Sequence, residues 1–187
     1  YMTSNLESLG YCKSIEDYHS LSQKLEKIGD AMEDRWRPYY YATFCQINMA
    51  FKSDSPDQTD EYLDKAQELI DEASGIEPAE SEIYALQALL YQARIKVDPR
   101  KRGPKFTKKA EEMLNEAAIL NSANPRVYYL LGQNYMAIPE QLGGGPAKAC
   151  TNYEKAKKLY KKFVPLNLIS PRWGEVMNYE AWEKHCR

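Results

Sequence analysis

The side chains that most often perform catalysis are few in this chain of 187 residues. His19 and His185 are its two histidines, and His185 lies at the C-terminal end. Cys12 and His19 would lie two turns apart on a helix, too far for a proton-transfer pair. No His-Glu-x-x-His, Gly-x-Ser-x-Gly or paired-histidine metal spacing occurs. We therefore expect no enzyme activity, no catalytic residue, no metal site and no cofactor.

The cysteines leave two alternatives open. Cys12, Cys45, Cys150 and Cys186 lie far apart with no CxxC pair, which excludes a zinc knuckle or a thioredoxin-like motif. Four free, buried thiols are one alternative. If the protein is exported, one or two disulfides are the other, and four cysteines allow three pairings.

Two segments could bind an anion. Gly143–Gly145 precede an expected helix, whose N-terminus attracts negative charge, but the Gly-Lys-Ser/Thr ending of a P-loop is absent. A tight turn is the expected role. A basic cluster could contact an acidic surface or a phosphate, or it could form a solvated loop. Its residues are Arg100, Lys101, Arg102, Lys105, Lys108 and Lys109.

Composition narrows the partner class. The 25 basic and 27 acidic residues give a net charge of -2, so we expect no nucleic-acid partner. The chain is 43% hydrophobic and 28% charged, as in folded proteins. No run of about 18 apolar residues occurs, so no membrane span is expected. Fifteen tyrosines suit half-buried grooves, because a tyrosine joins an apolar ring to a polar tip.

A repeated pattern of small and bulky residues predicts the elements that position these side chains. Three segments, 65–78, 109–122 and 148–161, carry a small, a bulky and a small residue at offsets of 0, +4 and +7, which share one helical face. The triplets are Ala66, Ile70 and Ala73; Ala110, Leu114 and Ala117; and Ala149, Tyr153 and Ala156. Leu21, Leu25 and Ile28 keep the offsets without the alanines. Small residues let helices approach closely, so we expect these faces to be buried.

The helices between these copies show a second pattern. Tyr84, Ala88 and Tyr91, and again Tyr128, Gly132 and Tyr135, place one small residue between two aromatic ones. A glycine within a helix costs about 1 kcal/mol relative to alanine. Close helix contact at Gly132 is the expected compensation.

The two patterns together resemble the A and B helices of the tetratricopeptide repeat (TPR). PRVYYLLGQNYM followed by AKACTNYEKAKKLY carries the resemblance, and Pro78 stands at the turn between repeats. The similarity covers roughly residues 20–160. The spacing departs from the family, whose period is about 34 residues. Tyr91 to Ala110 is 19 residues and Tyr135 to Ala149 is 14, and we expect loops there.

The resemblance implies an all-α fold, a right-handed α-α superhelix of about three helix pairs with N- and C-terminal capping helices. We expect one domain over 1–187, with a first helix pair at 14–52, middle helices within 58–97 and 106–138, a last B helix at 146–163 and a cap at 170–187. A short helix is expected at 3–12. Asp57 is the expected N-cap of a helix over 58–74 that ends at Gly75, and Ser170 is the N-cap of a last helix from Pro171. In the helix at 37–52, either Tyr39 or Tyr41 takes the first aromatic position. Trp173 and Trp182 would seal the end of the stack.

The resemblance also implies a function, a non-catalytic scaffold that binds a protein or peptide in the concave groove. Family contacts come from A-helix positions beside the buried face. Here the chosen positions are Tyr40, Phe44, Gln92, Arg126, Tyr129, Gln133 and Met136. The clamp by which some TPR domains hold a chaperone tail needs Lys and Asn. Its matching positions hold Ala85, Leu89, Tyr129 and Gln133, so we expect no such clamp.

Two other functions remain open. One is a self-assembling structural subunit or homo-oligomer, whose groove is filled by a terminal segment such as 161–170 of its own or a neighbouring chain. The other is an accessory protein that binds a small solute between repeats. The chain also resembles TPR-like proteins exported to the bacterial periplasm. Tyr1 at its start suggests a processed chain with a removed export signal, with a cytoplasmic location as the alternative.

Overall fold

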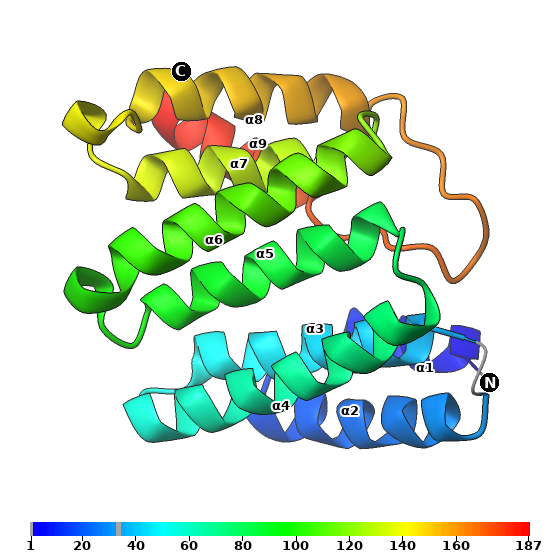
Figure 1. Ribbon diagram of the computed structural model, residues 1–187. Helices are drawn as coiled ribbons and strands as arrows, with labels where there is room; N and C mark the ends of the chain where they lie inside the picture. Colours follow the sequence, from blue (N-terminus) through cyan, green and yellow to red (C-terminus); the bar gives the residue numbers. More distant parts are fainter. Residues whose placement is uncertain (1, 33–34) are drawn as a thin grey trace.

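The computed structural model describes residues 2–32 and 35–187, and over this part of the chain every regular element is helical (Figure 1). The helices are α1 (Met2–Leu9), α2 (Ile15–Asp30), α3 (Arg37–Lys52), α4 (Pro56–Ile76), α5 (Ser81–Ile95), α6 (Pro99–Leu120), α7 (Pro125–Ala137), the short 3-10 helix η1 (Glu140–Leu142), α8 (Pro146–Tyr160) and α9 (Glu175–Cys186).

The A and B helices alternate as the repeats predict, but α3 begins the first pair, whereas the sequence pattern placed it second in a pair at 14–52. The pairs α3–α4, α5–α6 and α7–α8 are packed along their lengths and stack on one another, with α1 and α2 at one end and α9 at the other (Figure 1). One core cluster joins α2 to α5, and a second joins α5 to α9. The TPR-like helical solenoid of three pairs with terminal caps is therefore confirmed.

The small residues lie where helices touch. The alanines of the three B-helix triplets and Ala88 are fully buried. At Gly132 an added Cβ atom would overlap the ring of Tyr153, so only a glycine fits beside that ring. The predicted compensation for a mid-helix glycine is thus a close contact between α7 and α8.

The loop expected before residue 106 is wrong, because α6 begins at Pro99. Asp98 caps the helix by accepting a hydrogen bond from the main-chain N–H of Lys101, and proline is well suited to the first helical position. Arg102 then holds the added turns against α4 through two hydrogen bonds to Asp60, at 2.6 and 2.7 Å. Pro104 removes one main-chain hydrogen bond from α6, and the helix continues through it.

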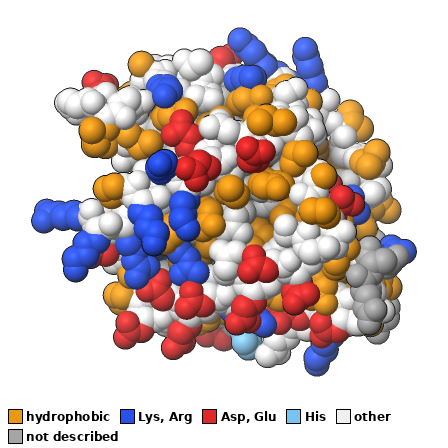
Figure 2. All heavy atoms as spheres, viewed as in Figure 1, with side chains coloured by type: hydrophobic (Ala, Val, Ile, Leu, Met, Phe, Trp, Pro, Cys, Tyr) orange, Lys and Arg blue, Asp and Glu red, His pale blue; other side chains and the backbone are white. Residues whose placement is uncertain are grey.

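The basic cluster therefore lies on a helix and not on a loop. Figure 2 shows Lys and Arg side chains gathered at the left edge, where α6 begins in Figure 1, above a band of acidic side chains. Gly143–Gly145 form the expected turn, and the Gly145 N–H donates to the main-chain oxygen of Tyr135 at 2.8 Å.

Two helix starts differ from the expectation. Helix α4 begins at Pro56 with Ser55 as its N-cap, not Asp57, and it runs past Gly75. Helix α9 begins at Glu175 after Gly174, whose φ is +104°, and not at Pro171. Ser170 does not cap that helix, because its hydroxyl accepts a hydrogen bond from the Asn167 N–H.

The packing of α3 settles which tyrosine takes the first aromatic position. Tyr39 is half-buried like Tyr84, and Thr43 four residues later is buried like Ala88. Phe44 and Leu89 then occupy the same place in successive repeats. Tyr41 is instead buried in the first core cluster.

Of the two alternatives for the cysteines, four free thiols is wrong, and the structure contains one disulfide. Cys150 and Cys186 form a disulfide that ties α8 to the end of α9. Cys12 and Cys45 are free, and burial raises the pKa of the Cys45 thiol well above its usual value.

Candidate ligand-binding cavity

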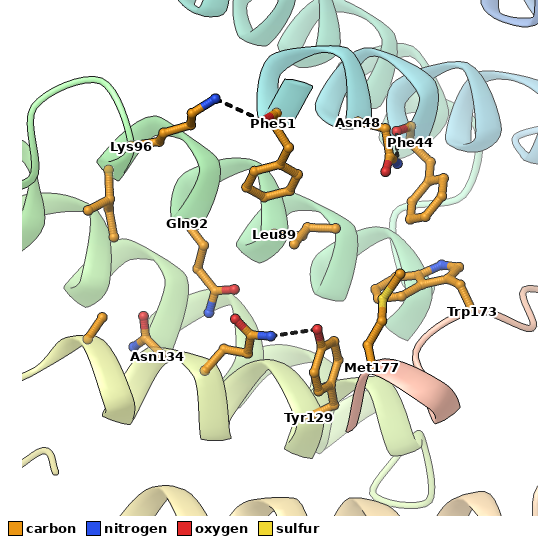
Figure 3. A pocket seen from close by; sticks show the side chains of 13 residues that line it. Phe44, Asn48, Phe51, Leu89, Gln92, Lys96, Tyr129, Asn134, Trp173 and Met177 are labelled. Carbon is orange, nitrogen blue, oxygen red and sulfur yellow. Dashed lines mark hydrogen bonds between the residues drawn. The ribbon is translucent and has the colours of Figure 1, made fainter. Parts of the chain in front are cut away.

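A cavity of about 450 Å³ lies on the concave face, between the A helices α3, α5 and α7 and the start of α9 (Figure 3). It is lined by Phe44, Asn48, Phe51, Leu89, Gln92, Ile95, Lys96, Tyr129, Gln133, Asn134, Ala137, Trp173 and Met177. Most of these residues belong to the C-terminal halves of the three A helices, which run in the same direction. The repeat register therefore brings them together.

Aromatic rings form much of the wall. The rings of Phe44 and Trp173 lie with their centroids 5.2 Å apart, and Phe51 is 43% exposed at the cavity. Tyr129 lies across from Phe51, on α7 (Figure 3). Such a wall suits a flat apolar molecule, because ring faces pack well on one another.

The amide side chains present their oxygens. Gln92 Nε2 donates to the main-chain oxygen of Leu130 at 2.9 Å, and Asn48 Nδ2 donates to that of Phe44 at 2.7 Å. Asn134 Nδ2 donates to the main-chain oxygen of Thr107 at 2.9 Å. A carbonyl oxygen can only accept, so each of these amides must turn its nitrogen to the main chain and its oxygen away from it.

Two other polar side chains of the cavity are already engaged. Gln133 Nε2 donates to the Tyr129 hydroxyl oxygen at 2.5 Å, and burial raises the pKa of Tyr129 to about 12. Tyr129 is therefore a neutral phenol at physiological pH. Lys96 Nζ donates to the main-chain oxygens of Ala50, Phe51 and Ser53, which fixes its charge at the end of α3.

One end of the cavity is closed by a segment of the same chain, the C-terminal strap (residues 161–174). Tyr41 Oη donates to the Ile169 oxygen at 3.1 Å, and Arg126 Nη2 donates to the Pro171 oxygen at 2.6 Å. Trp173 Nε1 donates to the Tyr40 hydroxyl at 2.8 Å. These contacts hold Trp173 as the end wall.

A buried ion pair supports the strap. Arg126 is fully buried, and its Nε lies 2.8 Å from Glu82 Oε2. The guanidinium also lies 4.8 Å from the ring centroid of Phe163 and 5.7 Å from that of Trp173. A buried charge needs such partners. The Arg126–Glu82 pair therefore holds the strap against the N-terminal ends of α5 and α7.

The structure places the seven predicted contact residues in three different surroundings. Phe44, Gln92, Tyr129 and Gln133 line the cavity. Tyr40 and Arg126 were expected on the groove surface, but the strap buries both. Met136 packs against the second core cluster and does not line the cavity. Whether any of the seven binds a partner stays a prediction.

Sequence reasoning missed several lining residues. Asn48 and Phe51 follow Phe44 at offsets of +4 and +7, so the helical spacing alone could have identified them. Trp173 was expected only to seal the stack, and no local signal marked Met177. The described part of the chain contains no cluster of side chains arranged to hold a metal ion. None of its helices is long and apolar enough to cross a membrane.

Comparison with known proteins places the fold. No protein-family model matches the chain, and no curated protein matches its sequence. The HusA haemophore from Porphyromonas gingivalis is similar in structure, with a TM-score of 0.90 and 27% sequence identity over 99% of this chain and 90% of that one. A thermophilic TPR protein from Thermus thermophilus aligns with a TM-score of 0.64 and 16% identity over 88% of this chain and 72% of the other.

The fold is TPR-like. The likeness to HusA extends over nearly the whole chain, including the strap and α9. The likeness to the HusA haemophore supports a binding scaffold as the function class.

Proposed function

We propose that this protein is a haem carrier that holds haem in the cavity on its concave face. The observation that carries the proposal is an aromatic, apolar cavity in a chain that follows the HusA haemophore along nearly its full length. Of the three functions expected from sequence, this one develops the small-solute alternative.

The dimensions and chemistry of the cavity support a flat cofactor-sized ligand. Its volume of about 450 Å³ lies within the range of roughly 300–1,000 Å³ that small-molecule sites occupy. Burial of apolar surface contributes about 25 cal/mol per Å², so the faces of a porphyrin ring would supply much of the binding energy. Met177 and Tyr129 are of types that coordinate haem iron, but the neutral phenol of Tyr129 is a weak ligand.

Export fits this function. The Cys150–Cys186 disulfide is of the kind that forms and persists in oxidising compartments. We therefore propose a periplasmic or otherwise exported protein.

A titration with hemin (ferric haem), followed by the Soret absorbance, tests the proposal. We expect saturation at one hemin per chain. Phe51→Asp places a carboxylate on the exposed edge of the wall and should weaken binding at least tenfold. Ile119→Asp is the matched control, because Ile119 is 76% exposed on α6 and does not line the cavity. Lack of saturation, or equal affinity of the two variants, contradicts haem binding at this site.

A protein or peptide partner is the second candidate, favoured by the TPR-like concave face. The strap fills the end of that face nearest the N-termini of the A helices, so a peptide would lie over the cavity residues. Tyr129→Ala with Gln133→Ala should then abolish peptide capture, with circular dichroism to check that the variant folds, because Tyr129 is buried. If capture survives in that variant, the peptide does not use this groove.

A homo-oligomer, the third function considered, stays a prediction. Residues Ile169–Trp173 of the same chain fill one end of the groove. Light scattering at micromolar and millimolar concentrations tests a homo-oligomer, which a monomer at both concentrations would exclude.

A further inference from the structure

The first half of the C-terminal strap leaves three aliphatic side chains in solvent. Val164 is 83% exposed, Leu166 87% and Leu168 71%. Figure 1 shows the strap passing outside the stacked helices on its way from α8 to α9. Large apolar side chains that gather at a protein surface mark a site that binds a protein or a membrane. The three residues therefore point to an occupant outside this chain.

The exposed segment is a held turn. Asn167 Oδ1 accepts hydrogen bonds from the Ile169 N–H and from the Ser170 hydroxyl, both at 3.1 Å. The Asn167 N–H donates to the Ser170 hydroxyl oxygen at 3.1 Å. Beyond the turn, Tyr41 Oη donates to the Ile169 main-chain oxygen at 3.1 Å. The helices behind the strap therefore fix its main chain, while its aliphatic side chains stay in solvent.

The chain on both sides of these side chains is positively charged. Between Glu154 and Glu175 every charged residue is basic, although the whole protein has a net charge of -2. These basic residues are Lys155, Lys157, Lys158, Lys161, Lys162 and Arg172. Lys161, Lys162 and Arg172 flank the aliphatic residues most closely, and all three are exposed. Such a surface attracts a negatively charged partner.

The residue types favour a lipid surface over a protein as that partner. Protein interfaces depend most on Trp, Tyr and Arg, whereas Leu and Val are under-represented among their energetically important residues. Apolar side chains that enter the boundary between headgroups and acyl chains, with basic side chains beside them, are typical of segments that bind anionic membranes. The long stems of lysine and arginine also allow their charges to stay in water while the apolar groups are buried.

We propose that the C-terminal strap is a docking surface for an anionic lipid membrane. Its three aliphatic side chains enter the acyl boundary, and the basic residues beside them contact lipid phosphates. None of the three aliphatic residues lines the cavity, so the docking surface is distinct from the proposed haem site and does not depend on haem binding.

Vesicle sedimentation with the full chain tests the proposal. Vesicles of equal parts phosphatidylglycerol and phosphatidylcholine should bind the wild type about tenfold more tightly than vesicles of phosphatidylcholine alone, because each basic residue near an anionic surface adds to the affinity. The combined variant Val164→Ser, Leu166→Ser and Leu168→Ser keeps the charge and removes apolar surface. It should weaken binding to the anionic vesicles about tenfold.

Three exposed apolar residues outside the strap provide the matched control. Tyr11 is 81% exposed, Ile119 76% and Leu142 75%. Serine at all three positions should leave vesicle binding unchanged. Melting curves check that both triple variants fold. Leu166→Ser against Ile119→Ser is the smaller pair that serves if a triple variant does not fold.

The charged part of the surface is tested separately. Lys161→Gln with Lys162→Gln should weaken binding to the anionic vesicles about tenfold. Lys105→Gln with Lys108→Gln, at two exposed lysines on α6, should leave it unchanged. This control also excludes the basic cluster of α6 as the membrane contact.

Four results would overturn the inference. They are a wild type that does not bind anionic vesicles, equal binding by the strap and control serine variants, equal binding to the two kinds of vesicle, and a larger loss from the α6 lysines than from the strap lysines. A wild type that ignores vesicles but forms a dimer in light scattering, which the strap serine variant dissociates, would assign the surface to a second copy of the chain instead.

Discussion

The two ends of the concave face are built from the same three helices and differ in what fills them. At the N-terminal ends of α3, α5 and α7, Tyr40, Glu82 and Arg126 form a buried network that binds the strap. At the C-terminal ends, Phe51 and Gln92 border an open cavity. The comparison shows that the repeat fixes which side chains face inward, whereas the strap decides which of them can reach a ligand.

The network end carries the largest expected effect on stability. Arg126→Met leaves the carboxylate of Glu82 buried without its cation, which should lower the free energy of unfolding by about 3–5 kcal/mol in urea titration. Adding Glu82→Gln should restore part of the loss, because the uncompensated charge is then gone. A single variant that loses less than about 1 kcal/mol would mean that the pair does not support this end.

The close contact between α7 and α8 at Gly132 carries the second-largest expected effect on stability. Gly132→Ala forces a Cβ into the ring of Tyr153, and we expect a loss of about 1–3 kcal/mol. Gly75→Ala is the control, because a Cβ there meets nothing within 4 Å, and it should stabilise the protein by about 0.4–1 kcal/mol. If the two substitutions change the free energy of unfolding in the same direction in urea titration, the contact assigned to Gly132 is wrong.

Removing Trp173, the wall between the two ends, should weaken ligand binding. Trp173→Ala removes one ring of the cavity wall and should weaken hemin binding about tenfold, since an aromatic contact contributes about 0.5–1.5 kcal/mol beyond its buried area. Trp182→Ala, on α9 but outside the cavity, should leave the affinity unchanged. If both variants bind alike, Trp173 is not part of the site.

The smallest expected effect is a loss of folding stability at alkaline pH, caused by Tyr129 at the cavity end. Burial raises the pKa of Tyr129 from its ordinary value of 10.0 to about 12, so the unfolded chain loses this proton first as pH rises. The stability that the neutral Tyr129 side chain contributes is complete below pH 10 and is lost between pH 10 and 12. The free energy of unfolding is lowered by about 1.4 kcal/mol at pH 11. Tyr129→Phe should remove that part of the decline in urea titrations at pH 9 and 11. Tyr11→Phe, at a side chain that is 81% exposed, should not change it.

Sequence alone predicted the features that depend on local periodicity. The buried alanines, Gly132 and the cavity residues Phe44, Gln92, Tyr129 and Gln133 all follow from offsets along one helix. Burial of Tyr40 and Arg126 could not be predicted, because it depends on the strap, whose hydrogen bonds to them join residues 45 and 133 positions apart. The pairing of Cys150 with Cys186 was equally hidden, since spacing does not select one of three pairings.

The position of bound hemin tests the central claim most directly. Ferric iron broadens the NMR signals of nearby nuclei, so addition of hemin to isotope-labelled protein should selectively broaden the amide signals of Phe51, Leu89, Gln92 and Gln133. Signals at the outer helices α1 and α2 should remain sharp. Broadening centred on α1 and α2, with the cavity signals unchanged, would contradict the assignment of the concave cavity as the haem site.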